Sequence, residues 1–279
     1  MNWVDLLLNL AGLGLWLAWR SAGFAARQSL RGASAPWLRQ ITPASRHRWV
    51  WLVALVILLA GRGWLYAQFG PEVNWIATLD LGIVEFPFKS VSVARMAAFS
   101  FLSFAVFLGG FYLWLLFLSS VNRGTADSLT WQRAIRRQLG WLDGWPWLLK
   151  LVGPWLLVML VWYLVNPALV EQGMAVAPRS AVQLWKQGAL VGVGTVVCWK
   201  YLIGLVLLLH IVNSFLYLGS SEFWMFITVT ARNLLRPLGG LPLRVGGIDF
   251  SPVVAIALTF LALEFAERAL RAAFVAQPL

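Results

Sequence analysis

Among the ionisable residues inside apolar stretches of the sequence, three could meet one another, and a charge there needs either an opposite charge or water. Lys200 lies in one such stretch, and Glu264 and Glu267 lie in a later one. Charged side chains in hydrocarbon are costly, and in membrane proteins they mark ion pairs or ion pathways. Counted at 1.5 Å per residue from the cytoplasmic ends of the two predicted crossings, Lys200 and Glu267 fall at similar heights. This predicts an intramembrane charge pair. The alternatives are snorkelling of Lys200 to the headgroups and a proton or ion path through the three residues.

Two further segments place arginines on one face of an expected surface helix. In residues 131–142 the apolar residues recur at helical spacing, and Gln132 and the arginines take the other face. Residues 224–235 look like a second copy, and a break rich in Gly and Pro follows each segment. A basic amphipathic helix suits an anionic lipid surface. We therefore expect contacts with lipid or a partner from six arginines: Arg133, Arg136, Arg137, Arg232, Arg236 and Arg244.

The most specific local pattern is Gly-Gly-Ile-Asp-Phe-Ser-Pro at residues 246–252. Gly246 and Gly247 permit a tight chain reversal. Ser251 is a good N-cap and Pro252 a good first helical residue, so a crossing is expected to begin here. Asp249 would lie beside that helix N-terminus, where the helix dipole favours a carboxylate. The pattern fits a structural turn and cap, and it also fits a contact point for a partner, a lipid headgroup or an ion.

At this motif the chain resembles the YGGT (YlmG) family of small bacterial and plastid membrane proteins. The matching residues are Arg236-Pro237 followed by residues 246–252 and an apolar helix. The resemblance implies a repeat of two crossings joined by an amphipathic cytoplasmic segment. Residues 189–270 would form the second repeat, residues 96–165 a degenerate first repeat, and residues 1–95 an N-terminal extension with two crossings. Family members are associated with cell division, with osmotic or ion homeostasis, and with assembly of a plastid cytochrome.

The sequence shows no arrangement typical of catalysis or metal binding. Cys198 is the single cysteine, which excludes an intramolecular disulfide and a Cys-rich metal site. His47 and His210 have no third histidine to join them, and His210 fits a packed helix histidine better than a ligand. There is no phosphate-binding Gly-rich loop and no recognisable nucleophile triad. We predict that the protein is not an enzyme and holds no metal or cofactor.

The elements that must position these residues are long apolar helices. The chain is 60% hydrophobic and only 12% charged, with mean hydropathy +0.75, whereas a soluble protein is about 25% charged. A span needs about 20 apolar residues. We therefore predict an all-α polytopic membrane protein with about six crossings, at residues 3–19, 49–69, 96–118, 147–165, 189–218 and 252–270. The first is marginal, because Asp5 and Asn9 lie in it.

The distribution of basic residues predicts the orientation. Segments after the first, third and fifth crossings hold fourteen of the 22 Lys and Arg residues, and the opposite side holds six. By the positive-inside rule the arginine-rich segments face the cytoplasm of a bacterial inner membrane. The net charge of +11 therefore reflects membrane topology and not nucleic-acid binding.

Two functions remain open. The first is a non-enzymatic scaffold or assembly factor, linked to the envelope, to cell division or to assembly of a membrane complex. Its partners would be anionic lipid headgroups and other membrane proteins, in a homo- or hetero-oligomer. The second is a channel-like or transporter-like role in ion or osmotic homeostasis. Conduction needs polar residues along a shared path, and only Lys200, His210, Glu264 and Glu267 are candidates.

Overall fold

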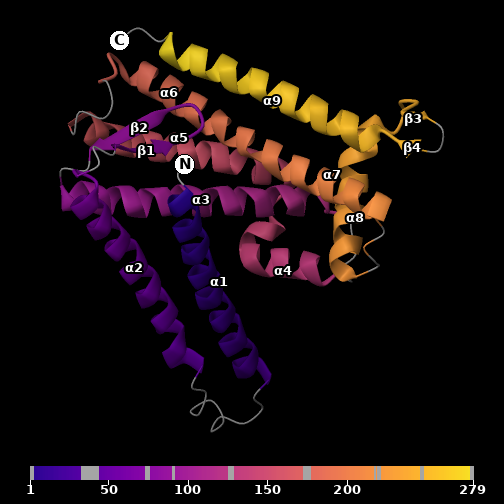
Figure 1. Ribbon diagram of the computed structural model, residues 1–279, viewed down its shortest axis with the longest axis horizontal. Helices are drawn as coiled ribbons and strands as arrows, with labels where there is room; N and C mark the ends of the chain where they lie inside the picture. Colours follow the sequence, from indigo (N-terminus) through magenta and orange to yellow (C-terminus); the bar gives the residue numbers. More distant parts are fainter. Residues whose placement is uncertain are drawn as a thin grey trace. The chain divides into compact units, whose positions relative to one another are not determined.

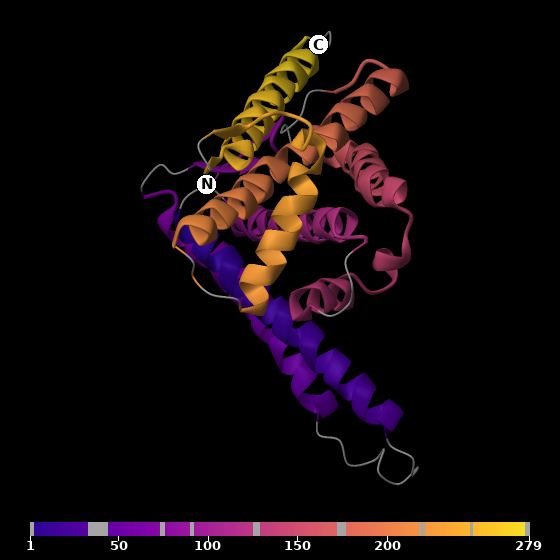
Figure 2. The same cartoon turned by 90° about the vertical axis from the view of Figure 1, so that its right-hand side faces the viewer.

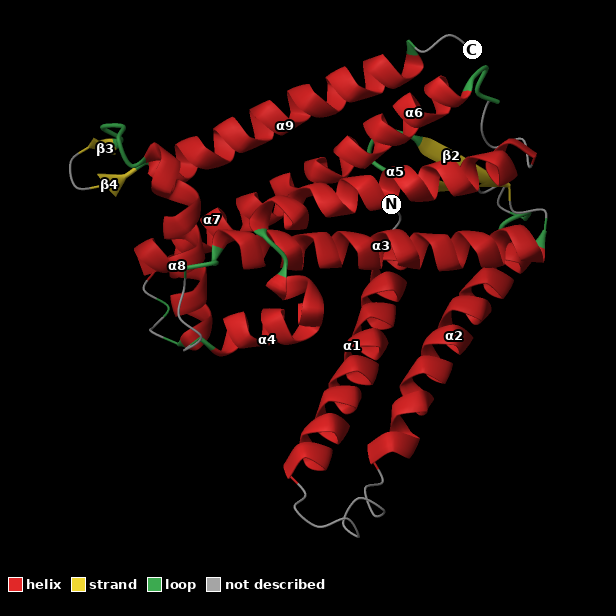
Figure 3. Cartoon of the chain, turned by 180° about the vertical axis from the view of Figure 1, so that it is seen from behind, coloured by secondary structure: helices red, strands yellow, loops and turns green. Residues whose placement is uncertain are grey.

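The fold was examined in a computed structural model, which describes residues 3–32, 44–72, 76–89, 92–124, 129–171, 177–216, 218, 221–245 and 248–276. Helices dominate, with two short hairpins added (Figure 3). The prediction of an all-α chain is confirmed. The chain divides into two compact units, Met1–Asp80 with Glu85–Gly109, and Leu81–Val84 with Gly110–Leu279. The predicted boundary at residue 95 falls inside a helix of the structure, α3 (Val93–Val121).

In the first unit, α1 (Trp3–Gly32) and α2 (Ala44–Phe69) pack side by side (Figure 1). The start of α3 joins them, and Leu55, Leu59 and Phe104 form a small apolar core. The backbones of α2 and α3 approach closely at Gly63, where a Cβ atom would lie 2.7 Å from Ala97 Cα. The hairpin of β1 (Ile76–Asp80) and β2 (Glu85–Lys89) is antiparallel, with Ile76 opposite Lys89 and Asp80 opposite Glu85.

The second unit is built on a hairpin of long helices. α5 (Trp147–Glu171) packs against α6 (Ala181–Gly194), and a 3₁₀ turn, η3 (Thr195–Cys198), joins α6 to α7 (Trp199–Leu216). α9 (Ser251–Val275) lies along α6 and α7 (Figure 1). Gly192 allows α6 to approach α5, because a Cβ atom there would lie 2.7 Å from the Trp155 carbonyl oxygen. The helical segment that corresponds to the fifth predicted crossing begins at Ala181 and not at residue 189, and η3 interrupts it.

Two shorter helices complete this unit. α4 (Thr130–Leu139) continues into the 3₁₀ turn η2 (Gly140–Gly144), and α8 (Glu222–Leu235) into η4 (Arg236–Leu238). α8 turns sharply away from the line of α7 (Figure 2) and contacts α4, with the rings of Trp131 and Phe223 5.6 Å apart. A two-residue hairpin, β3 (Arg244–Val245) with β4 (Ile248–Asp249), precedes α9.

Four helical segments are long and apolar enough to cross a membrane: Arg48–Phe69, Val93–Val121, Trp147–Glu171 and Ala181–Leu216. They correspond to the second to fifth predicted crossings. The first and sixth predicted crossings are helices too, α1 and α9, but among the described residues these two do not meet that standard of length and apolarity. Large apolar side chains are exposed on the surfaces of the four segments, including Ile57, Leu157 and Leu208. Such surfaces are expected to face lipid.

Pro154 lies inside α5 and does not begin it. The structure starts the helix seven residues earlier, at Trp147. A proline inside a helix removes one backbone hydrogen bond. Membrane helices tolerate this because neighbouring groups can satisfy the freed carbonyl.

Candidate functional site

The structure brings together the three ionisable residues of the predicted charge pair. Lys200 Nζ lies 2.7 Å from Glu267 Oε2 and 3.3 Å from Glu264 Oε2. The side chains of Lys200 and Glu267 are 7% and 17% exposed, whereas that of Glu264 is 47% exposed. Arg268 and Arg271 bind the same two glutamates one turn further along α9, at 3.3 and 3.2 Å. The cluster is thus a row of alternating charges from α7 and α9, buried at Lys200 and Glu267 and exposed at Glu264 and Arg268.

A second buried ion pair lies in the first unit. Arg62, which lies in the C-terminal half of α2 and is 3% exposed, donates to Asp5 Oδ1 at 2.7 Å and to Asn9 Oδ1 at 2.8 Å. Ser103 accepts from Arg62 at 3.2 Å, and Tyr66 donates to Asp5 at 2.6 Å. The two polar residues of α1 therefore face a cation in α2. Sequence reasoning assigned no partner to Arg62.

A pocket lies at the start of α5. Its volume is about 350 Å³, and its wall includes three cations and one carboxylate: Arg123, Arg136, Lys150 and Asp143. The remaining lining residues are Ser119, Gly144, Trp145 and Pro146. Residues 119 and 123 come from the end of α3 and the turn after it, and residue 136 comes from α4. Residues 143–150 come from η2 and the first turn of α5, so the pocket depends on three separate segments.

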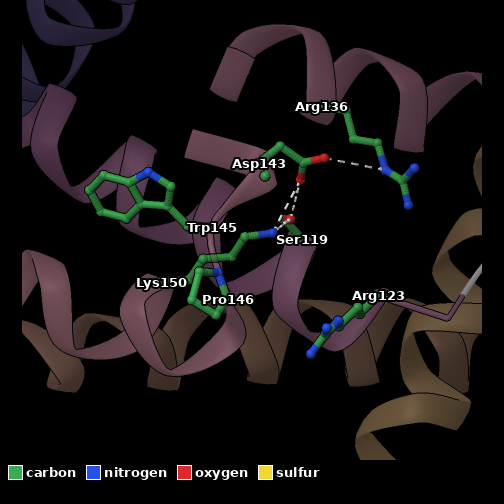
Figure 4. Close-up of a pocket in the computed structure, with 8 residues that line it drawn as sticks. Ser119, Arg123, Arg136, Asp143, Trp145, Pro146 and Lys150 are labelled. Carbon is green, nitrogen blue, oxygen red and sulfur yellow. Dashed lines mark hydrogen bonds and ion pairs between the residues drawn. The ribbon is translucent and has the colours of Figure 1, made fainter. Parts of the chain in front are cut away.

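Hydrogen bonds fix the floor of this pocket (Figure 4). Lys150 Nζ donates to Ser119 Oγ at 2.8 Å and lies 3.4 Å from Asp143 Oδ1. The Ser119 hydroxyl donates in turn to the same carboxylate. Arg136 Nε lies 3.7 Å from the other oxygen, Asp143 Oδ2. Lys150 and Ser119 are buried, whereas Arg136 is only partly buried.

The contact between Ser119 and Lys150 raises the question of nucleophilic catalysis. A serine is activated when a neighbouring base can take its proton, so Lys150 would have to be neutral. Asp143 lies within 3.4 Å of that ammonium group, so the lysine is already held in an ion pair. The serine proton also points to Asp143 and not to the lysine. The geometry therefore suits binding of an anion better than attack by Ser119.

The arginines of α4 and α8 lie mostly at the surface. Arg133, Arg137, Arg232 and Arg236 are exposed, and Arg136 lines the pocket. The side chain of Arg244 lies outside what the structure describes. One prediction about this face is wrong, because Gln132 is 1% exposed and donates to the Asn122 carbonyl oxygen at 3.5 Å. α4 packs against α8 and the end of α3, and its buried face includes the polar residue Gln132.

Asn122 organises a small polar network that the sequence did not indicate. Its side-chain nitrogen donates to Thr230 Oγ1 at 2.9 Å, and its side-chain oxygen accepts from Asn233 at 2.9 Å. Asn122 and Thr230 are both fully buried. The network joins the turn after α3 to α8, and it fixes the position of the arginine-bearing helices.

The Gly-Gly-Ile-Asp-Phe-Ser-Pro motif is only partly visible. Gly246 and Gly247 lie outside the described residues. Asp249 is exposed and its carboxylate accepts from the backbone N–H of Ser251 at 2.9 Å. α9 begins at Ser251, with Phe250 in the capping position and Pro252 in the first turn. The prediction of Ser251 as the N-cap is therefore one residue late, and Asp249 supplies the capping carboxylate.

No family model, curated protein or solved structure matches the chain. The resemblance to the YGGT family stays a prediction. Among the described residues, no three His, Cys, Asp or Glu side chains are placed to hold a metal ion. His210 lies partly buried in α7 and Cys198 at the end of η3.

Two sequence signals could have identified the residues that were missed. Asp5 and Asn9 are four positions apart, and so are Arg62 and Tyr66. Residues four apart share one helix face, so two polar faces in adjacent helices could have been paired. The pocket had a weaker signal, because Asp143 and Lys150 are separated by a break whose geometry the sequence does not specify.

Proposed function

We propose that the protein is a non-enzymatic scaffold or assembly factor of a bacterial cytoplasmic membrane. Its arginine-bearing helices α4 and α8 would hold it against anionic lipid headgroups. Its long apolar helices would bind other membrane proteins. One observation carries the proposal. The cations within the apolar helices, Arg62 and Lys200, are paired with carboxylates, while Arg133, Arg137, Arg232 and Arg236 are exposed.

The burial and pairing of the cations Lys200 and Arg62 argue against conduction. A conduction path needs polar groups that remain accessible along a shared route. Lys200 is 7% exposed and its ammonium already contacts two carboxylates. Arg62 is likewise enclosed by Asp5, Asn9 and Ser103. These pairs fit the structural role of holding helices together in lipid.

We also propose that α1 and α9 cross the membrane, which makes six crossings. Both helices fall short in apolarity because of polar residues that the structure shows to be paired: Asp5 and Asn9 in α1, and Glu264 and Glu267 in α9. Their outer faces are apolar, with Leu7 and Phe265 exposed. The positive-inside rule then places the arginine-rich connections in the cytoplasm.

The element order supports the proposed repeat. A long helix, a shorter helix, a 3₁₀ turn and a long helix occur in this order as α3, α4, η2, α5 and again as α7, α8, η4, α9, with the β3–β4 hairpin before α9 in the second set. A repeated order of this kind is what two copies of one supersecondary unit produce.

Lipid binding tests the proposal directly. The full chain is reconstituted into phosphatidylcholine nanodiscs, with and without about 20 mol% phosphatidylglycerol, and crosslinking or exchange of a labelled acidic lipid is measured. Each lysine or arginine near an anionic surface contributes about 1 kcal/mol. We expect the fourfold variant with glutamine at 133, 137, 232 and 236 to lose most of its enrichment of the acidic lipid.

The matched control changes four arginines to lysine at the same positions, which keeps the charge. We expect that variant to retain the enrichment. Equal enrichment in all three proteins would contradict the proposal. Ion flux through the wild-type protein in liposomes, lost on Lys200→Ala, would favour the channel-like alternative instead.

A further inference from the structure

We propose that the pocket at the start of α5 binds the phosphate group of an acidic lipid headgroup. The inference rests on the proposed function, because it assumes that the arginine-bearing face lies on a lipid surface. It goes further by naming one site, built by Arg123, Arg136 and Lys150, where a single lipid is held in preference to others.

The charges of the pocket fit an anion. Three cations and one carboxylate line it, which leaves an excess of two positive charges. Asp143 already contacts Lys150 and Arg136. Within the part of the chain that the structure describes, Arg123 has no ion-pair partner, and its side chain is exposed. A phosphomonoester carries a charge of about −1.5 to −2 at pH 7, so it fits the excess better than a phosphodiester.

The arrangement of the donors also suits a phosphate. Figure 4 shows the Lys150 ammonium group beside Ser119, with Arg136 above them and Arg123 below. Arginine presents several N–H donors in a planar fork that matches phosphate oxygens. Lys150 cannot move freely, because Ser119 and Asp143 hold its ammonium group. The floor of the pocket is therefore fixed before a ligand arrives.

The surroundings point to a lipid and not to a soluble phosphate compound. Trp145 forms one wall, and its ring packs edge-on against that of Trp141, with centroids 5.1 Å apart. Trp141 is 75% exposed, and Trp147 and Leu148 at the start of α5 are exposed too. Exposed tryptophans gather at the headgroup level of membranes. The pocket lies at the first turn of a helix long and apolar enough to span, which is the depth of a headgroup.

The volume agrees with this assignment. At about 350 Å³ the pocket lies at the lower end of the range for small-molecule sites, which is about 300–1,000 Å³. It can hold a phosphate and part of a glycerol, while the acyl chains run along the apolar surface of α5. A phosphatidic acid headgroup matches both the charge and the size.

The test compares two double variants of the full chain in mild detergent. Arg123→Gln with Arg136→Gln removes two cations from the pocket, and Arg179→Gln with Lys186→Gln removes two exposed cations that lie outside the pocket and outside α4 and α8. Native mass spectrometry measures binding of phosphatidic acid, phosphatidylglycerol and phosphatidylcholine, and inorganic phosphate serves as a competitor. We expect the pocket variant to bind phosphatidic acid about tenfold more weakly and the control within about twofold of wild type.

The outcomes separate the two proposals. Equal losses in both variants would overturn the pocket but leave general binding of acidic lipid standing. No loss in either would overturn the pocket, while the fourfold variant at 133, 137, 232 and 236 decides general binding of acidic lipid separately. Competition by inorganic phosphate at the concentration of the lipid would overturn the lipid assignment. If the double variant does not fold, Arg123→Gln alone decides the question, because that exposed side chain has no ion pair among the described residues.

Discussion

Replacing Asp5 by alanine is expected to destabilise the protein by about 3 kcal/mol, because it leaves a buried arginine without its carboxylate. Arg62 is 3% exposed and donates to Asp5 Oδ1 at 2.7 Å. Asn9 and Ser103 would remain as neutral acceptors, so the loss falls at the lower end of the range for a broken buried pair. Tyr66 would lose its acceptor as well. Unfolding by sodium dodecyl sulfate in mixed micelles measures the change.

A double variant separates the cost of an unpaired buried cation from the loss of the hydrogen bonds that Asp5 makes. Replacing both charges, Asp5→Ala with Arg62→Met, removes the uncompensated cation and is expected to recover most of the stability. Ser21→Ala serves as a control on the same helix, since that exposed hydroxyl only bonds to the backbone one turn earlier. An Asp5→Ala protein as stable as wild type would show that Arg62 reaches headgroups or water in the membrane.

This ion pair shows where sequence reasoning failed. Asp5 and Asn9 made the first crossing look marginal, because each residue was weighed against lipid. The structure places both against Arg62 and Ser103 in neighbouring helices. A polar residue in an apolar helix therefore does not indicate whether the helix crosses a membrane until its partner is known. The partner of Asp5 is 57 residues away.

Lys200 and its glutamates were predictable for a simple geometric reason. Both helices are long and regular, so the rise per residue fixes the height of each charge. The pocket was not predictable in this way. Its position depends on η2, where Gly140 adopts φ of 60°, and on the turn that brings Arg123 beside α5. The spacing of residues does not give the path of such turns.

Gln132 illustrates the same limit for helix faces. Its polarity assigned it to the face with the arginines, but helical spacing places position 132 on one face with Ile135 and Leu139. α4 turns that face to Asn122 and α8, and it leaves Trp131 47% exposed. A surface helix that packs on protein can bury an amide, because a backbone carbonyl is there to accept its hydrogen bond.

Replacing Glu267 by alanine is the second change with a large expected effect, about 2 kcal/mol of lost stability. Its carboxylate lies 2.7 Å from the ammonium of Lys200, and its side chain is 17% exposed. Glu264 stays within 3.3 Å of the same ammonium, so the lysine is not left wholly unpaired. The free energy of unfolding in mixed micelles is again the measurement.

The same change at Glu264 is the matched control. That side chain is on the same helix and contacts the same lysine, but it is 47% exposed and already bonded to the exposed Arg268. We expect a much smaller loss there, because a solvated pair contributes little. Equal, small losses at both positions would mean that Lys200 snorkels to the headgroups. A larger loss at Glu267, relieved by adding Lys200→Met, would instead establish the charge pair as the element that joins α7 to α9.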